Sequence, residues 1–385
     1  MALPPEQYCA FTSGLVELSP LLYGNARSSR VLSMKLRFWR YDLKLAHRWT
    51  VSSGAAPGGS GGTEVYPVVM VELTDRDGLV GLGEVAPSAR YEESAEWSIK
   101  YLESVNSYQL SSGDIPGSMQ YLESIAPRRW AAKAAMNVAL WDLAARRAGQ
   151  SVADHLELGF TEGRHMTSFS LGIDTPEVMR QKTLEAASYP VLKLKVGCAT
   201  DQANLAAVRE VAPGKPLRLD ANEAWKTKEE ALAKLEWLAK DRSIQFVEQP
   251  MPSSSPREDW IWLKERTPLP IFADESYLTA ADIGFCSEVF HGVNVKLAKT
   301  CGISGAVAAL KAARQAGLKT MLGCMIESSV LITAAAHLAE LTDYLDLDGC
   351  LLITNDPYQG VSLEGGRLSF ASARDPLGLR VRARY

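Results

Sequence analysis

Two lysines stand two residues apart in the segment 191–196 (VLKLKV). The apolar residues predict a strand, and side chains alternate across a strand, so Lys193 and Lys195 point the same way. If the apolar set faces a layer of helices, both lysines point into the interior. Two ammonium groups that close lower each other's pKa, which makes at least one of them a usable base near neutral pH. A lysine pair on an exposed strand edge is the commoner meaning of this pattern, so the pair alone is a weak signal.

Three carboxylates follow, each at the end of a short apolar strand. Asp220 ends the run LRLD, Glu248 ends IQFVE and Asp274 ends IFAD. Three acids at one height on adjacent parallel strands repel each other unless a cation lies between them, and all-oxygen ligands suit a hard ion, Mg²⁺ above all. One strand-end aspartate alone is more often a helix N-cap, but three in register after a lysine pair favour a metal site. The five histidines show no ligand spacing, which argues against zinc.

A further lysine, Lys296, ends the next apolar run (VNVK). It is expected to enter from the side roughly opposite Lys195. A carbon acid held between two lysines, with its carboxylate on the metal, can lose a proton on one face and regain it on the other. The divalent cation stabilises the enediolate more than it stabilises the substrate. The residues therefore indicate racemisation or epimerisation, although most strand-end lysines simply extend to solvent.

The elements that must position these side chains alternate between short strands and amphipathic helices after residue 160. Steps of this kind predict an α/β fold of the (β/α) TIM-barrel type, with the active site at the carboxyl ends of the strands. A doubly wound sheet is the rival, but the glycine-rich phosphate turn expected after its first strand is missing. The predicted strands are 168–171, 191–196, 217–220, 244–248, 271–274, 292–297 and 319–322.

The first part of the chain reads differently. Residues 35–45 alternate as a half-buried strand does, 66–73 and 79–85 predict a hairpin, and helices are expected from about residue 92 into the 140s. We therefore expect an α+β capping domain over 34–160 beside a barrel over 161–360. Residues 1–33 read as a loosely attached extension, and 361–385 are expected to return to the capping domain. The glycine-rich segment 51–62 is either a hairpin tip or a mobile lid.

Composition narrows the class of protein. The net charge of −4 argues against a general nucleic-acid binder. No apolar run is long enough to cross a membrane. The six cysteines are scattered without a C-x-x-C pair, which favours reduced thiols and a cytoplasmic location. The sequence leaves open whether the chain forms a homo-oligomer.

The order K-x-K, D-x-N, E-x-P, D-E-S and V-K-L-x-K resembles the muconate-lactonising-enzyme subgroup of the enolase superfamily over roughly residues 34–370. The resemblance implies a modified (β/α)7β barrel, with Lys195 and Lys296 as the acid/base pair and Lys193 tuning Lys195. It also implies that Mg²⁺ is held by the three carboxylates. The segment 323–329 is similar to the family's seventh strand. Where the mandelate-racemase and dehydratase branches usually place a catalytic histidine, this chain has Glu327, which we count among the predicted substrate-binding residues.

The substrate prediction depends on the segment 344–349 (YLDLDG). Asp346 and Asp348 alternate onto one face, which suits gripping a cationic group, although a solvated turn is the ordinary alternative. This D-x-D resembles the dipeptide epimerases, where the pair binds the α-ammonium group of the substrate. Arg48, before the glycine-rich segment, is the candidate for holding an acidic side chain, as in alanyl-glutamate epimerases. The side-chain preference itself stays open.

We therefore expect a Mg²⁺-dependent dipeptide epimerase. Within the same subgroup the alternatives are a cycloisomerase, a succinylbenzoate synthase or an N-acylamino acid racemase, whose ligands carry no free ammonium group. A non-catalytic barrel that only binds a ligand is the remote alternative. It is disfavoured because buried unpaired charges cost stability without a use.

Overall fold

The computed structural model describes residues 34–52 and 62–384. The predicted extension 1–33 and most of the glycine-rich segment, residues 53–61, lie outside the described residues.

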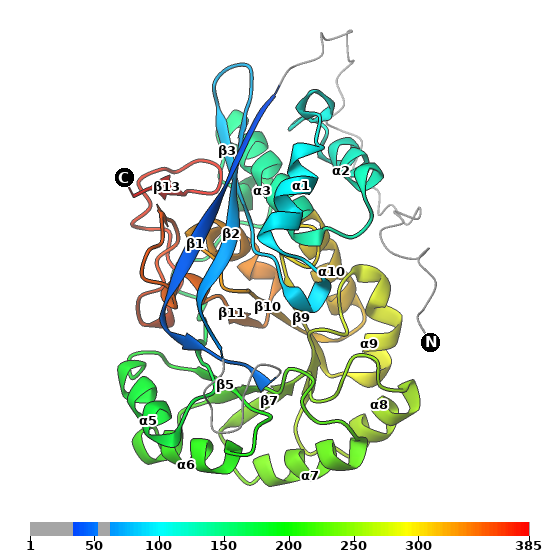
Figure 1. Ribbon diagram of the computed structural model, residues 1–385, viewed down its shortest axis with the longest axis vertical. Helices are drawn as coiled ribbons and strands as arrows, with labels where there is room; N and C mark the ends of the chain where they lie inside the picture. The colour runs from blue at the N-terminus through cyan, green and yellow to red at the C-terminus, as the bar shows by residue number, and fades with distance from the viewer. Residues whose placement is uncertain (1–33, 53–61, 385) are drawn as a thin grey trace.

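The larger domain of the molecule is built around a sheet of eight parallel strands (Figure 1). Each strand pairs with its sequence neighbours in the order β4 to β11. The ring closes where the backbone N–H of Ser168, just before β4, donates to the carbonyl of Leu345 in β11 at 3.1 Å. The barrel prediction is thus confirmed and the doubly wound sheet is excluded. The strands are β4 (Phe169–Leu171), β5 (Leu192–Lys195), β6 (Leu217–Asp220), β7 (Ile244–Glu248), β8 (Ile271–Ala273), β9 (Gly292–Lys296), β10 (Lys319–Gly323) and β11 (Tyr344–Asp346).

Helices connect the successive barrel strands within the described residues, giving the (β/α)7β arrangement. Local sequence starts several of them: the Thr175 hydroxyl caps α5, whose first residue is proline, and the Thr227 hydroxyl caps α7. The helices are α5 (Pro176–Glu185), α6 (Asp201–Val211), α7 (Lys228–Leu238), α8 (Arg257–Lys264), α9 (Ile283–Val289), α10 (Ile303–Gln315) and α11 (Ser329–Ala336).

A plug of apolar side chains fills the barrel interior. Phe246 and Phe272 stack with ring centroids 4.1 Å apart, and Met321 and Tyr344 pack against them. Two residues further along β7, on the same inward face, stands Glu248, and two residues after Phe272 stands Asp274. One layer of inward-pointing side chains is therefore apolar, and the next layer, nearer the carboxyl ends of the strands, is charged.

A cap lies over the carboxyl ends of the barrel strands (Figure 1). Its antiparallel sheet contains β1 (Lys35–Trp49), β2 (Thr63–Thr74) and β3 (Val80–Val85), and its helices are α1 (Ala95–Glu103), α2 (Ile115–Ile125) and α3 (Trp130–Arg147). The first strand is longer than predicted because its pairing with β2 resumes at Trp49 opposite Thr63, after an irregularity. At Gly83 the strand meets α3 so closely that an added Cβ would lie 2.0 Å from the Ala135 carbonyl oxygen.

The last residues contact the cap helix α3. The N–H of Leu379 donates to Asp142 Oδ1 at 2.9 Å, and Arg146 pairs with Asp375 at 2.7 Å. The domain bounds 34–160, 161–360 and 361–385 themselves stay predictions.

The remaining elements are α4 (Val152–His155), β12 (Tyr358–Gln359), β13 (Arg382–Ala383) and the 3₁₀ turns η2 (Ala89–Tyr91), η3 (Ser107–Gln109), η4 (Ala280–Asp282), η5 (Ala339–Leu341), η6 (Gly349–Leu351) and η7 (Glu364–Gly366). Among the described residues, no helix combines the length and the apolar character needed to cross a membrane.

Candidate active site

Three carboxylates meet at the carboxyl ends of β6, β7 and β8. Asp220, Glu248 and Asp274 are all buried, and each offers an oxygen within 4.8 Å of those of the others. Asp220 and Glu248 are paired residues in the parallel register of β6 and β7, so their side chains lie at the same height in the barrel. A buried set of carboxylate oxygens at this spacing fits a hard divalent cation.

The electrostatics of the three carboxylates also favour a cation. Burial, and next the charge of Asp220, raise the pKa of Glu248 to about 7. The pKa of Asp274 is driven well below its ordinary value, because Lys296 and Lys299 outweigh the effect of burial. Positive charge beside the cluster therefore favours ionised carboxylates; the neighbouring ammonium groups supply it here, and a bound metal ion would add to it.

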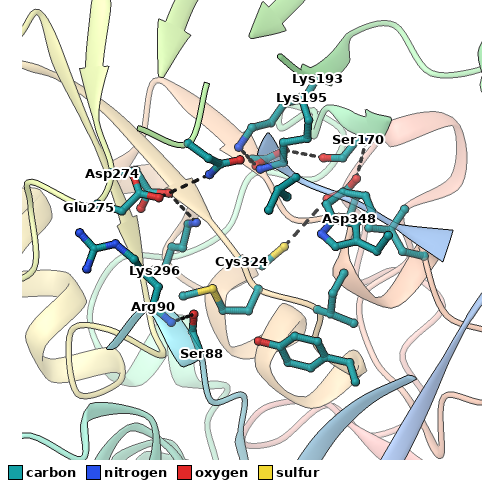
Figure 2. Close-up of a pocket in the computed structure, with 18 of the residues that line it drawn as sticks. Ser88, Arg90, Ser170, Lys193, Lys195, Asp274, Glu275, Lys296, Cys324 and Asp348 are labelled. Carbon is teal, nitrogen blue, oxygen red and sulfur yellow. Dashed lines mark hydrogen bonds and ion pairs between the residues drawn. The ribbon is translucent and has the colours of Figure 1, made fainter. Parts of the chain in front are cut away.

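Lys195 and Lys296 project toward the carboxylates from opposite sides of the ring. Lys195 ends β5 and Lys296 ends β9, four strand positions apart among eight. The Lys195 ammonium lies 2.6 Å from Asp220 Oδ2, and that of Lys296 lies 2.7 Å from Asp274 Oδ2. Both lysines line one cavity (Figure 2). The structure thus brings together the two lysines and the three carboxylates singled out in the sequence.

Lys193 lies deeper than Lys195 and is enclosed by acids. Its ammonium is 2.7 Å from Glu248 Oε2, 2.7 Å from Asp346 Oδ2 and 3.1 Å from Asp220 Oδ2. Burial lowers its pKa, but these carboxylates outweigh burial and raise the pKa of Lys193 well above its ordinary value. The expected depression of pKa by a neighbouring ammonium is therefore wrong for Lys193, because the sequence pattern did not show the three acids around it.

Asp346 and Asp348 both reach the same cavity from the end of β11. Asp348 Oδ2 accepts from the N–H of Ser170 at 2.6 Å, and Asp346 Oδ1 accepts from the hydroxyl of Ser168 at 2.7 Å. Burial raises the pKa of Asp346, but Lys193 lowers it to about 2, whereas burial and the charge of Asp346 raise the pKa of Asp348 to about 7. A cationic group placed at Asp348 would stabilise its ionised form.

The cavity has a volume of about 360 Å³ and lies between the cap and the barrel (Figure 2). The cap supplies walls that were not predicted from the sequence. They are formed by Trp49, Tyr66, Arg90 and Tyr91. Arg90 crosses to the barrel, where its guanidinium binds both oxygens of Glu223 at 2.6 and 2.9 Å. No local pattern in the sequence links Arg90 to a residue so far along the chain.

On the barrel side, the segment 324–326 forms one wall of the cavity. Glu327 follows it but does not line the cavity. The residue is 1% exposed, and its carboxylate accepts from the N–H of Met325 at 3.0 Å. Burial raises the pKa of Glu327 to about 8. Next to it, the N–H and hydroxyl of Ser328 donate to Glu84 of β3 at 2.8 and 2.6 Å, which ties this wall to the cap. A substrate-contacting role for Glu327 remains only a prediction.

Arg48 also lies outside the wall of the main cavity. It is on the exposed end of β1, where its guanidinium donates to Glu64 at 3.2 Å. It lines a second cavity of about 240 Å³ that shares Trp49, Ser170 and Leu352 with the first. The assignment of Arg48 to an acidic substrate side chain therefore stays a prediction.

The start of the glycine-rich segment is attached at the site. Val51 lines the main cavity, and the hydroxyl of Ser52 donates to the carbonyl of Ala221 at 2.9 Å. The choice between a lid and a hairpin tip concerns residues 53–61, which are outside the described part of the chain.

An eight-stranded barrel with acidic residues on three successive strands, flanked by lysines and covered by an α+β cap, defines a class of cation-dependent barrel enzymes. Residues 177–349 match the model described as "Enolase C-terminal domain-like", and residues 59–156 match "Mandelate racemase / muconate lactonizing enzyme, N-terminal domain". The chain belongs to this enolase-superfamily family.

Individual proteins of this family are similar to the chain over most of its length. The chain is 60% identical to an L-Ala-D/L-amino acid epimerase of Pedosphaera parvula over 91% of this chain and all of the relative. It is 36% identical to an L-Ala-D/L-Glu epimerase of Bacteroides thetaiotaomicron, over 87% of this chain and 85% of that protein. Among solved structures, a dipeptide epimerase of Enterococcus faecalis complexed with Mg and L-Leu-L-Tyr matches with a TM-score of 0.81 and 30% identity, over 91% of this chain and 99% of the other.

Proposed function

We propose that this protein is a dipeptide epimerase that uses Mg²⁺ and inverts the α-carbon beside the substrate's carboxylate. The observation that carries the proposal is the placement of Lys195 and Lys296 on opposite sides of the buried carboxylates, with the acidic pair Asp346 and Asp348 in the same cavity. The relatives named above, which are epimerases of dipeptides, support the same activity.

In this proposal, Asp220, Glu248 and Asp274 hold the Mg²⁺ ion. When bound, the ion supplies positive charge that stabilises the negative charge developing on the substrate's carboxylate as the α-proton leaves. Lys195 and Lys296 then divide the proton transfer: one removes the α-proton from its face, and the other returns a proton to the opposite face. Lys193 sets the electrostatic surroundings of Lys195 from the layer beneath. The net reaction moves no atom other than the α-proton, so no further reactant is needed.

Asp346 and Asp348 support a dipeptide over an N-acylamino acid as the substrate. The two residues are 4% and 2% exposed, and they line the cavity together with Lys193 and Ser170. The single positive charge of Lys193 is shared among three acids, which leaves the acidic pair with negative charge for an α-ammonium group. An N-acyl group is neutral and would leave Asp348 buried without a cationic partner, which is costly.

We also propose a cytoplasmic location, which five free thiols among the described residues support.

The experiment that tests the proposal is deuterium exchange. The protein is incubated with Mg²⁺ and a panel of L,L-dipeptides in D₂O, and the products are analysed by mass spectrometry and chiral chromatography. We expect at least one dipeptide to gain a single deuterium and to yield its L,D epimer. Exchange into N-acylamino acids but into no dipeptide would contradict the substrate assignment.

Asp348→Asn is expected to weaken dipeptide turnover selectively. The substitution keeps the shape of the side chain but removes the charge that attracts the ammonium group, and truncating a buried charge pair costs about 2 kcal/mol or more, roughly 30-fold in kcat/KM. Mg²⁺ affinity, measured by titration calorimetry, should stay at the wild-type value because Asp348 is not one of the three clustered carboxylates. An equal fall in Mg²⁺ affinity and turnover would show that Asp348 does not serve the ammonium group alone.

A further inference from the structure

Lys299 is a buried cation that the proposed proton transfer does not use. It is the last lysine of the segment 293–299 (VNVKLAK), and its side chain is 0% exposed. The described residues that line the main cavity do not include it. A buried ammonium group is costly unless it is well paired, so its partners indicate its role.

The Lys299 ammonium donates to two acceptors of one residue, Asp274. The Nζ atom lies 2.5 Å from Asp274 Oδ1 and 2.6 Å from the Asp274 backbone carbonyl oxygen. One ammonium group thus binds the main chain and the side chain of the same aspartate, which restricts rotation of the carboxylate. The other oxygen, Oδ2, is left for the cavity side, where it contacts Lys296 at 2.7 Å.

The turn after β9 places Lys296 and Lys299 on two sides of the same carboxylate. The N–H of Lys299 and the hydroxyl of Thr300 both donate to the Lys296 carbonyl, at 3.1 and 3.0 Å. The turn ends at Gly302, whose φ of +90° favours glycine and whose N–H donates to the Leu297 carbonyl at 2.9 Å. The backbone therefore fixes the position of Lys299 relative to Lys296, and Asp274 lies between the two ammonium groups.

We propose that Lys299 is a positioning residue for the cation site, which holds Asp274 so that a single oxygen, Oδ2, is offered to the metal. This inference rests on the proposed function only in taking the three carboxylates as the metal ligands. The alternative role, simple neutralisation of charge, predicts the opposite effect on metal affinity. Removing a positive charge beside a cation site strengthens cation binding by Coulomb's law, whereas losing the orientation of a ligand weakens it.

The test is the Mg²⁺ affinity of Lys299→Met, measured by titration calorimetry without dipeptide. We expect the dissociation constant to rise about 10- to 100-fold, as is typical when a partner that orients a metal ligand is lost. The rise in Tm that Mg²⁺ gives the wild-type protein should shrink accordingly in this variant.

Lys133→Met is a matched control in the cap. Lys133 is also buried, at 1% exposed, and its ammonium also binds one carboxylate and one carbonyl: Glu123 at 2.5 Å and the Ala126 oxygen at 2.7 Å. This variant loses a comparable buried ion pair away from the carboxylates. Its dissociation constant for Mg²⁺ is expected to equal that of the wild-type protein, whatever its stability.

An unchanged or tighter Mg²⁺ constant in Lys299→Met would overturn the inference. Lys299→Gln, which keeps an N–H donor and removes the charge, should raise the constant less than Lys299→Met does, because the remaining donor can still hold Asp274 in part. If neither Lys299 variant folds while Lys133→Met does, the role of Lys299 is structural and the inference is also overturned. A wild-type protein that binds Mg²⁺ but exchanges no dipeptide would remove the proposed function and leave this inference standing.

Discussion

Asp220→Asn is expected to abolish measurable epimerisation. The side chain keeps its size, but the carboxylate cluster loses one of its three negative charges and one strong cation ligand. Because the bound ion supplies several kcal/mol of charge stabilisation, turnover should fall at least about 10³-fold. Dialysis of the wild-type protein against EDTA should give the same loss, and added Mg²⁺ should restore the activity. Initial rates of epimer formation measure both effects.

Asp343→Asn is the control for this substitution. Asp343 directly precedes β11 at the opposite end of the barrel, where it pairs with Lys319 at 3.0 Å and accepts from the N–H of Thr320 at 2.9 Å. The same chemical change there should leave turnover and Mg²⁺ affinity near wild type. An Asp220→Asn protein that still binds Mg²⁺ and epimerises dipeptides at the wild-type rate would contradict the assignment of the metal ligands.

Lys296→Ala is expected to block epimerisation by removing the acid/base group on one face. Loss of a general acid or base costs about 10²- to 10⁴-fold in rate. Unlike Asp220→Asn, this variant should still exchange the α-proton of the epimer that presents its proton to Lys195. Chiral chromatography measures the loss of epimer, and mass spectrometry measures the exchange that remains.

Lys264→Ala serves as the matched control for a lysine of the barrel. Lys264 ends α8 on the outside of the barrel, and its ammonium donates to the carbonyls of Ser287 and Glu288 at 3.0 and 2.9 Å. Its removal should leave both epimerisation and exchange near wild type. Full epimerase activity in Lys296→Ala would show that the proton is delivered by another group.

The barrel and its charged layer were predictable because the signals are local and periodic. Each of the three acids ends, or directly follows, a run of apolar residues, and the parallel register then brings strand ends to one height. Lys195 and Lys296 follow from the same alternation, since inward positions recur every second residue along a strand. Strand periodicity and the position of the acids at strand ends therefore predicted the barrel and the grouping of these residues, and the family resemblance added their roles.

The cap side of the site was not predictable in this way, because its contacts join distant parts of the chain. Arg90 binds Glu223 across more than a hundred residues of sequence, and Trp49 reaches the cavity only because β1 extends beyond its regular pattern. The surroundings of Lys193 were missed for the same reason. Its carboxylate neighbours come from three other strands, and they reverse the expected direction of its pKa shift.

The role of Lys299 could not be predicted from the sequence for a different reason. The V-K-L-x-K pattern contains it, but the spacing does not reveal that its ammonium donates to two atoms of Asp274. That contact depends on the turn after β9, where Gly302 adopts a positive φ and allows the chain to reverse. A residue that orients a metal-ligating side chain can therefore be part of a sequence motif although the motif does not show which side chain it contacts.

The most direct test of the central claim is a crossed exchange measurement with both lysine variants and both substrate epimers. Lys195→Ala and Lys296→Ala are each incubated with Mg²⁺ and with the L,L or the L,D form of a dipeptide that the wild-type protein epimerises, in D₂O. We expect each variant to exchange the α-proton of one epimer only, and the two variants to prefer opposite epimers. Equal loss of exchange from both epimers in either variant would contradict a mechanism in which two amines serve opposite faces of one carbon.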